Sequence, residues 1–496
     1  MMPSDAFRSS CMIAAVLLAV SAPSGLTWSQ SRAQTTAGTA RPIRPPEPAA
    51  EAGAFRHLRV LQDIASANEG NRAAGTPGYD RSAEYVSEQL AKAGYQVRFE
   101  EFEFPFFQER SPPVLAVHAA DGSQQPASAG AVRTLANSGA GDVTARLSAV
   151  NLKLDAEPPA ASASGCEAGD FKDFERGAVA LIRRGTCQFQ TKVENAVAAG
   201  AVGVIIMNEG TDGRKDAFSG QLSKLVPVPV IGIPYAFGRT LGADAQTGSI
   251  TVHLAVDAVA GKRPSRNVIA ETAGGGDGPL IVVGAHLDSV LEGPGINDNG
   301  SGTAAVLEAA LQLAPELAQG RRHVRFAFWG AEERGLIGSR RHVDALSEEE
   351  RRRIAVYINL DMVGSPNFTR YVQGPATTDD GPAALARREL AAEFREHGLN
   401  IEERTGTRFG SDDSSFSQKG IPTVGLYTGA GGMKSEKQAS LFGGTAGRPF
   451  DPCYHQACDA IDNIDRGVLE QNARALVRTL KAVTTLPGGP ERRNAL

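Results

Sequence analysis

The sequence predicts an α/β fold with a mostly parallel sheet flanked by helices. Three apolar runs rich in β-branched residues indicate buried strands: LIVVGAHLD (280–288), HVRFAFWGAEE (323–333) and IAVYINLDMVG (354–364). Strands covered on both faces read as continuous apolar runs, and they are typical of parallel sheets. Between the first two runs, TAAVLEAALQLA (303–314) has the pattern of a helix, and the glycines of the preceding NGSG allow a tight turn into it.

Residues that commonly bind metals occur where these strands end. His286 closes the first run, Glu333 the second and Asp361 the third, while Asp298 precedes NGSG and His455 lies in CYHQACD. Open α/β sheets build their sites at the carboxyl ends of strands, so we expect the five side chains to converge. Two imidazoles and three carboxylates suit two zinc ions that share one bridging carboxylate. Any one of these residues alone would more often be a cap or a surface residue.

One further acid stands directly beside a predicted ligand. Glu332 precedes Glu333, which leaves a carboxylate next to the metals and free to move protons. The remaining histidines have no comparable context, and we interpret them as structural or surface residues: His57, His118, His253, His323, His342 and His397.

The motifs together resemble the co-catalytic zinc aminopeptidases of the M28 metallopeptidase family. The matching segments are AHLDS, GINDNGSGTAAVLE, WGAEERGLIGS, NLDMVG, GSDDSSFSQKGIPTVGLYTGA and CYHQACD. The resemblance covers about residues 264–482 and the preceding segment 55–104, in which GNRAAGTPGYDRSAEYV (70–86) is similar to the family's N-terminal stretch. It implies the zinc-exopeptidase fold, which is phosphorylase/hydrolase-like, and two Zn²⁺ per chain.

The resemblance assigns the five predicted ligands to two metals. His286 and Asp361 would hold one zinc, Glu333 and His455 the other, and Asp298 would bridge them. It also implies that the chain is an enzyme, a metallopeptidase that removes the first residue from peptides with a free N-terminus.

Other catalytic roles are likewise implied by the resemblance. Asp288 would orient the imidazole of His286, Glu332 would be the general base, and Tyr454 would donate a hydrogen bond to the developing oxyanion. One departure is visible: GSDDS (410–414) has Asp413 where the family more often has histidine.

The two ends of the chain are predicted to lie outside the folded domains. Residues 1–33 contain Arg8 and then CMIAAVLLAV (11–20), a run too short to span a bilayer, and they indicate a signal peptide rather than a buried helix. Residues 34–54 are rich in proline and alanine and predict a flexible leader, while 486–496 form a tail. We therefore expect a secreted or periplasmic protein.

The cysteines agree with an oxidising compartment. Removal of residues 1–33 leaves four, which are expected to pair or, alternatively, to stay as free thiols. The resemblance implies a Cys453–Cys458 disulfide that braces the loop carrying Tyr454 and His455. We expect Cys166 and Cys187 to form the second pair.

Charge and hydropathy exclude other classes of partner. The chain has 51 basic and 56 acidic residues, for a net charge of −5, so nothing indicates a nucleic acid or an acidic membrane surface. No other apolar run is long enough to span a membrane.

The middle of the chain predicts a separate unit. Residues 173–210 read as a strand, a glycine-bounded helix and the apolar strand AVGVIIM, and LVPVPVIGIPYAFGRTL (225–241) follows. These segments are similar to a protease-associated (PA) domain, small and β-rich, inserted at about 106–260 between the peptidase segments 55–105 and 261–485. It would either shape the cleft as a lid or wall or contact protein substrates, or it would act as a structural spacer.

Substrate selection depends on less specific residues. Phe416, Tyr427 and Met433 are candidates for an apolar wall around the first side chain, and Arg408 for a contact to a substrate backbone or carboxylate. Ordinary core packing remains the alternative for Phe416, and a solvated surface position for Arg408.

Three alternatives to an aminopeptidase stay open. A dipeptidase or carboxypeptidase of the same superfamily would need a cation for the substrate's carboxylate, for which Arg408 is the candidate. A glutaminyl-cyclase-like transferase would use one zinc, and a receptor-like binding protein would be expected to lack ligands. The complete set of five ligands with Glu332 argues against the last two.

Overall fold

The computed structural model of this chain describes residues 53–118, 124–128, 130–154, 162–247, 250–272, 279–319, 323–375, 381–406 and 409–485. The expected signal peptide 1–33, the leader up to residue 52 and the tail 486–496 lie outside these ranges. Within them, no helix is both long enough and apolar enough to cross a membrane.

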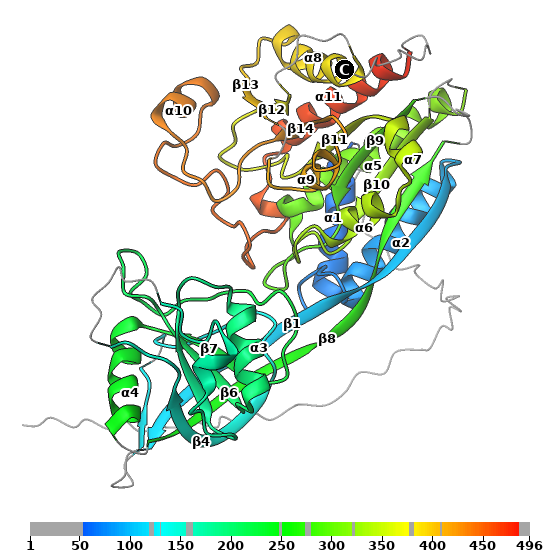
Figure 1. The fold of residues 1–496 in the computed structure, drawn as a ribbon. Coiled ribbons are helices and arrows are strands. Elements are labelled where there is room, and N and C mark those ends of the chain that lie inside the picture. Colours follow the sequence, from blue (N-terminus) through cyan, green and yellow to red (C-terminus); the bar gives the residue numbers. More distant parts are fainter. Residues whose placement is uncertain are drawn as a thin grey trace, which may run out of the picture. The chain divides into compact units, whose positions relative to one another are not determined.

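The fold alternates strands and helices along the chain (Figure 1). The strands are β1 (Gln96–His118), β2 (Gln124–Pro126), β3 (Arg133–Thr134), β4 (Gly141–Ala149), β5 (Val179–Arg183), β6 (Gly203–Met207), β7 (Val230–Ile233), β8 (Thr251–Glu271), β9 (Leu280–His286), β10 (His323–Trp329), β11 (Ile354–Leu360), β12 (Tyr371–Gly374), β13 (Glu402–Thr405) and β14 (Thr423–Tyr427). The helices are α1 (Phe55–Ala67), α2 (Pro77–Lys92), α3 (Phe189–Ala199), α4 (Tyr235–Thr247), α5 (Gly302–Leu317), α6 (Ile337–Ala345), α7 (Glu348–Arg353), α8 (Pro382–Glu396), α9 (Asp413–Ser417), α10 (Glu436–Phe442) and α11 (Arg466–Thr485), with short helical turns η1 (Ala168–Phe171), η2 (Ile296–Ser301) and η3 (Ile461–Asn463).

The sheet of the peptidase segments has the strand order β13-β12-β14-β11-β9-β10-β8. Its centre is parallel, because β9 pairs in parallel with both β10 and β11, and β11 pairs in parallel with β14. The pairs β12–β14 and β10–β8 are antiparallel. The predicted α/β fold with a mostly parallel sheet is confirmed, and the three apolar runs form β9, β10 and β11.

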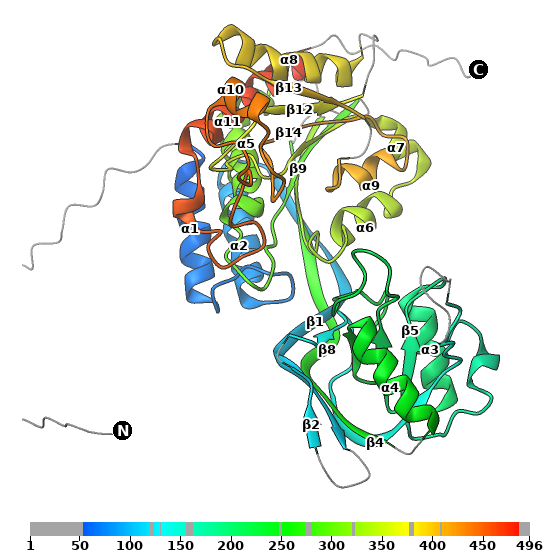
Figure 2. The ribbon, with the colours of Figure 1, turned by 90° about the vertical axis from the view of Figure 1, so that its left-hand side faces the viewer.

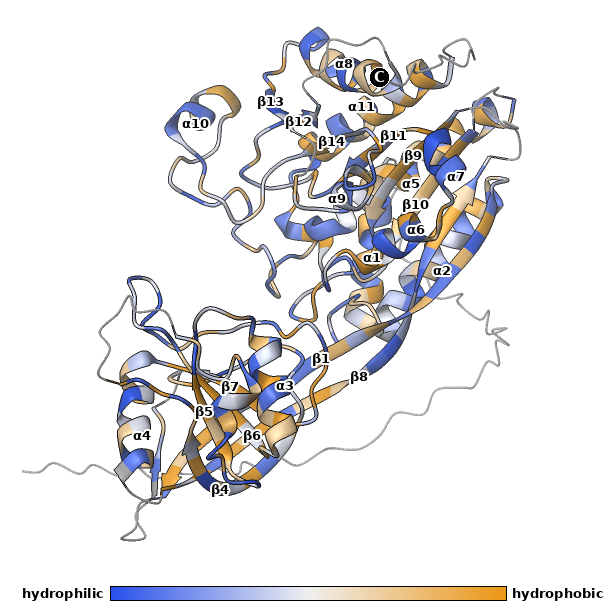
Figure 3. Cartoon of the chain, viewed as in Figure 1, coloured by the Kyte–Doolittle hydropathy of each residue, from blue (hydrophilic) through white to orange (hydrophobic). Residues whose placement is uncertain are grey.

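Helices cover both faces of this sheet. Along β9, Ile281 and Val283 pack into the core under α1, α2, α5, α8 and α11, while Leu280 and Val282 face the core that includes Val343 of α6. Figure 2 shows α1 and α5 on one side of the sheet and α6, α7 and α9 on the other. In Figure 3 the central strands are hydrophobic, whereas α7 is hydrophilic. This double covering explains why the strands read as unbroken apolar runs.

The strand order continues into the insert, where β8 pairs antiparallel with β4. Strands β4, β5, β6 and β7 pair in parallel in that order, with α3 following β5 and α4 following β7. The long strands β1 and β8 pair antiparallel from Gln96–Glu271 to His118–Thr251. Both strands therefore continue through the expected boundaries at residues 106 and 260.

Candidate metal centre

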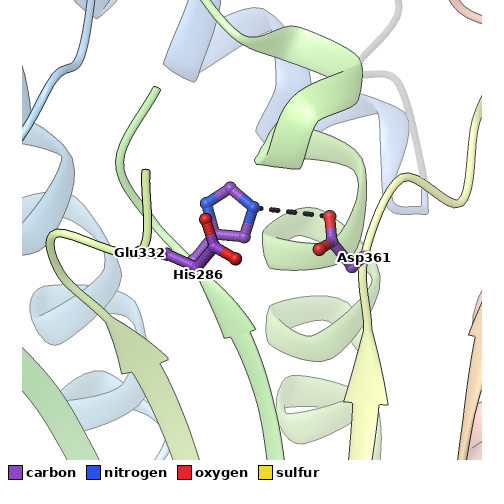
Figure 4. A group of neighbouring side chains, drawn as sticks. All are labelled: His286, Glu332 and Asp361. Atoms are coloured by element: carbon purple, nitrogen blue, oxygen red, sulfur yellow. Dashed lines mark ion pairs between the residues drawn. The ribbon is translucent and has the colours of Figure 1, made fainter. Parts of the chain in front are cut away.

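Three parallel strands deliver the first group of acidic and imidazole side chains. His286 is the last residue of β9 and lies beside Trp329, the last residue of β10. Glu332 follows β10 within a few residues, and Asp361 directly follows β11. One ligand atom each from His286, Glu332 and Asp361 lie within 4.8 Å of one another. Figure 4 shows the three side chains meeting above the strand ends, with His286 directed at Asp361.

Asp298 lies between the two predicted histidine ligands. Its Oδ1 is 3.2 Å from Nε2 of His286, and its Oδ2 is 3.2 Å from Nε2 of His455. Each histidine also faces a second carboxylate: His286 Nε2 is 3.3 Å from Asp361 Oδ1, and His455 Nε2 is 3.1 Å from Glu333 Oε2. The structure thus brings all five predicted ligands together in two groups that share Asp298.

Two acids that the sequence reading did not single out fix the loop carrying Asp298. Asp459 accepts hydrogen bonds from the backbone N–H groups of Asn297 (2.8 Å) and Asp298 (2.9 Å). Asp451 accepts one from the side-chain amide of Asn297 at 2.6 Å. Both acids flank His455 in sequence, so the same segment supplies one ligand and positions another. Their position on either side of CYHQAC is the only sequence signal that could have found them.

The carboxylate of Asp288 mainly contacts the backbone of the segment that carries Glu332 and Glu333. It accepts hydrogen bonds from the backbone N–H groups of Glu332 (3.1 Å) and Glu333 (3.3 Å). His286 Nδ1 is 3.0 Å from the backbone carbonyl of Asp288, whereas the nearer carboxylate oxygen is 3.8 Å away. The imidazole therefore takes its orientation from the Asp288 main chain, and the carboxylate aims the two glutamates.

Arg72, which the sequence reading also missed, ties two ligand segments together. Its buried guanidinium donates hydrogen bonds to the carbonyl oxygens of Leu287, Pro294 (2.9 Å) and Gly295 (2.6 Å). Leu287 follows ligand His286, and Gly295 precedes the turn that carries Asp298. A buried arginine with five fixed donors can hold several carbonyls at once.

The predicted ligands open onto a cavity of about 200 Å³. Tyr454 lines it, and its ring stacks on His455 with centroids 3.9 Å apart. Tyr427 also lines it, as do Gln373 and Phe409, which the sequence reading did not select. Burial holds the pKa of Tyr454 above its usual range, so its hydroxyl stays a hydrogen-bond donor.

The other candidates for the substrate pocket lie elsewhere. Phe416 lies on α9 and is fully buried, and its ring stacks on the ring of Tyr357 in β11 with centroids 3.9 Å apart. Met433 is 65% exposed, and neither residue lines the cavity. Arg408 lies outside the described residues.

Several buried carboxyl groups lie close together in this site. Burial and the nearby charge of Asp298 raise the pKa of Glu333 to about 7. Burial also holds the pKa of Glu332 well above its usual range, and the acids Asp412 and Asp361 act in the same direction. Burial lowers the pKa of His455, but Asp298 and Glu333 outweigh it and raise the value to about 10. Crowded carboxylates of this kind suit divalent cations.

The donor set fits zinc. Imidazole nitrogen and carboxylate oxygen are zinc ligands, and Glu333 Oε1 is buried without a hydrogen-bond partner among the described residues. A carboxylate oxygen that is desolvated and unpaired is costly unless a cation neutralises it.

Both expected disulfides are present. Cys453 pairs with Cys458 and closes the short loop that carries Tyr454 and His455, and Cys166 pairs with Cys187 in the insert. The described loop thus has a covalent brace directly beside a ligand.

Comparison with known proteins gives the same picture. The sequence profile of peptidase family M28 matches residues 267–480, and that of the PA domain matches residues 143–241. An aminopeptidase of Pseudomonas aeruginosa is 45% identical over 432 residues, which cover 85% of this chain and 78% of the relative. A probable lipoprotein aminopeptidase of Mycobacterium tuberculosis is 38% identical over 451 residues, covering 88% of this chain and 85% of the relative.

A solved structure extends the match to the fold. A zinc aminopeptidase from Bacillus subtilis superposes with a TM-score of 0.60 at 25% sequence identity, covering 88% of this chain and 96% of that one. The expected M28 resemblance and the expected PA insert are confirmed by these matches. The chain belongs to peptidase family M28.

Proposed function

We propose that this protein is an aminopeptidase that hydrolyses the first peptide bond of peptides with a free N-terminus at a two-zinc centre. The observation that carries the proposal is the position of Asp298, whose two carboxylate oxygens each lie 3.2 Å from a different histidine. A carboxylate that bridges two metals must direct one oxygen at each of them, whereas the ligand of a single metal need not.

Each metal would have its own pair of ligands beside the shared one. His286 and Asp361 would hold one zinc, and Glu333 and His455 the other. When bound, the zinc ions would supply Lewis acidity that polarises the scissile carbonyl and makes a water molecule more acidic. Asp288 and Arg72 keep the protein side of this arrangement rigid, through the hydrogen bonds described above.

Glu332 would move the protons of the reaction. Its carboxylate lies next to His286 and Asp361, where it can take a proton from water and return it to the leaving amine. Tyr454 would donate a hydrogen bond to the oxyanion as it develops, because its hydroxyl borders the same cavity and stays protonated.

Selection for a free N-terminus follows from charge. A substrate α-ammonium or α-amine would enter a cavity bordered by the carboxylates of Asp361 and Glu332. An acetylated N-terminus lacks the charge and keeps only a single N–H donor for that contact. Cleavage after the first residue is therefore favoured over cleavage inside a peptide.

The domain organisation and the compartment are part of the proposal. The peptidase domain would comprise residues 55–105 and 261–485, with the PA domain inserted at about 106–260. The predicted signal peptide and the two disulfides support export to a secreted or periplasmic location.

The direct test combines metal content with substrate choice. The mature protein is analysed for zinc and assayed with leucine p-nitroanilide and with its N-acetylated form. About two zinc ions per chain, with cleavage of only the free-amine substrate, is the expected result. One zinc would instead favour a cyclase-like transferase, and two zinc ions without cleavage would favour a dipeptidase or carboxypeptidase.

A further inference from the structure

Gln373 is a largely buried residue whose amide side chain lines the cavity. The residue is 6% exposed and lies in the cavity lining together with the predicted metal ligands. No hydrogen bond of this side chain is found with any residue in the described part of the chain. An amide that lines a binding cavity offers donors and an acceptor to a bound ligand.

One strand separates Gln373 from the strand that precedes Asp361. On β12, Gln373 lies opposite Gly425 of β14, which in turn pairs with Asn359 of β11. Residues paired across a sheet share a face, and Gly425 presents no side chain there. A Cβ at Gly425 would lie 2.6 Å from the carbonyl oxygen of Asn359. Glycine at this position is therefore required by the close approach of the Asn359 main chain, and Gln373 and Asn359, two strands apart, both line the cavity.

Aromatic rings form two walls of the cavity near Gln373. Tyr427 and Phe409 line the cavity. Asp413 fixes the loop of Phe409, because its carboxylate accepts hydrogen bonds from the backbone N–H groups of Phe409 (2.8 Å) and Ser411 (3.1 Å). The residue at which the sequence departs from the family pattern therefore positions one wall of the pocket.

A cation stands next to these walls. Arg404 pairs with Gln373 across β12 and β13, and its guanidinium lies 5.8 Å from the ring centre of Tyr427 and 5.9 Å from that of Phe409. Arg404 forms no ion pair with the described residues. Its charge would disfavour lysine or arginine as the first residue of a substrate.

The position of β12 also sets the length of the side chain that can reach Gln373. Two strand spacings separate β12 from β11, whose end carries Asp361, and neighbouring strands lie roughly 4.8 Å apart, giving about 10 Å in total. Short side chains would stop before the amide, and branched ones would meet the aromatic walls.

We propose that Gln373 is a specificity-determining residue, which hydrogen-bonds the polar end of a long, unbranched and uncharged first side chain, so that N-terminal glutamine is favoured over an aliphatic residue of the same length. The inference rests on the proposed aminopeptidase function. A site built to hydrogen-bond a substrate group discriminates against analogues that lack the group, because its own polar atoms are then left unpaired.

The test uses substrates with the same leaving group and different first residues: glutamine, norleucine, glutamate and lysine. Norleucine is the matched control, since it is unbranched and lacks the amide. We expect the wild-type protein to give a higher kcat/KM for glutamine than for norleucine. In the Gln373→Met variant, the glutamine-to-norleucine ratio should fall roughly five- to tenfold, as expected for the loss of one hydrogen bond. Gln418→Met, at an exposed glutamine, should leave the ratio unchanged.

Several outcomes would overturn the assignment. An equal or higher kcat/KM for norleucine in the wild type rejects it even if the variant does not fold. A ratio that does not change in a folded Gln373→Met variant also rejects it, as does a preference for glutamate, which would indicate control by the charge of Arg404. In these cases cleavage of free-amine substrates persists and the proposed function stands. No cleavage of any free-amine substrate would remove both proposals.

Discussion

Asp459 fixes the main chain at Asp298: its Oδ2 accepts a hydrogen bond from the backbone N–H of Asp298 at 2.9 Å, and its Oδ1 accepts one from the backbone N–H of Asn297 at 2.8 Å. The side chain of Asp298 is then free to face His286 and His455. Because Asp459 directly follows the loop that the Cys453–Cys458 disulfide closes around His455, two of the predicted ligands are positioned by the same segment.

Replacing Asp459 should weaken metal binding. In Asp459→Asn, an amide group would face one of the two backbone N–H donors, and the Asp298 loop would lose a hydrogen bond. Loss of such supporting contacts lowers metal affinity about 10- to 100-fold. We expect this decrease in a chelator competition for zinc, with much of the activity returning at excess zinc. Asp462→Asn, at an exposed position on the same segment, is the control, and an equal decrease in both variants would contradict the prediction.

Glu332→Gln should separate catalysis from metal binding. The amide has nearly the shape of the carboxylate but cannot accept a proton, so kcat should fall about 10²- to 10⁴-fold. Zinc content should stay that of the wild type, because the five ligands are retained. Parallel measurements of zinc content and leucine p-nitroanilide hydrolysis check both statements.

The matched control for this substitution is Glu292→Gln, at an exposed glutamate in the loop after β9. It should retain both zinc and activity. A fully active Glu332→Gln variant would remove Glu332 from its role as the general base.

Tyr454→Phe should reduce kcat with little effect on KM. The phenylalanine ring can keep the stack on His455, but the hydrogen bond to the oxyanion is lost. Loss of one such donor typically costs about 10²-fold in kcat. Since the raised pKa of Tyr454 keeps its hydroxyl protonated, the ratio of wild-type to variant kcat should be constant between about pH 6 and pH 9. A rise in KM alone would show that Tyr454 binds the substrate without stabilising the transition state.

The core strands and the convergence of the five candidate ligands could be predicted from the sequence because each carries a local signal. The apolar runs end at His286, Glu333 and Asp361, and parallel strands necessarily bring these ends to one edge. Asp298 and His455 were found through glycine-rich and cysteine-bounded motifs. For these residues, neighbours in sequence already define the structural context.

The supporting residues could not be predicted in this way. Arg72 lies more than 200 positions before the carbonyls that it holds, and a surface arginine would look the same in the sequence. Gln373 lies on the short strand β12, whose pairing with β13 and β14 is not visible from YVQG. Phe416 has the apolar side chain expected of a pocket wall, and only its stacking on Tyr357 shows that it belongs to the core.

The buried contact between Glu308 and His57 should make stability depend on pH. Glu308 on α5 lies 3.2 Å from His57 Nε2 and 2.9 Å from Arg56, and Tyr85 contacts the other nitrogen of His57 at 2.6 Å. The hydrogen bond from His57 lowers the pKa of Glu308 from 4.5 to about 2, although burial acts in the opposite direction. A lowered folded-state pKa adds stability above the unfolded value of 4.5, and this contribution is lost as the pH falls towards 2.

Thermal unfolding of the metal-free protein at pH 7 and pH 3 measures this contribution. Glu308→Gln should lower Tm at pH 7, and the difference from the wild type should shrink at pH 3, where the wild-type carboxylate loses its advantage. Glu316→Gln, on the same helix but at an exposed ion pair with Lys481, should cause little change at either pH, since surface pairs contribute little. A Glu308→Gln effect of the same size at both pH values would show that packing, and not the charge of Glu308, stabilises the contact between α1 and α5.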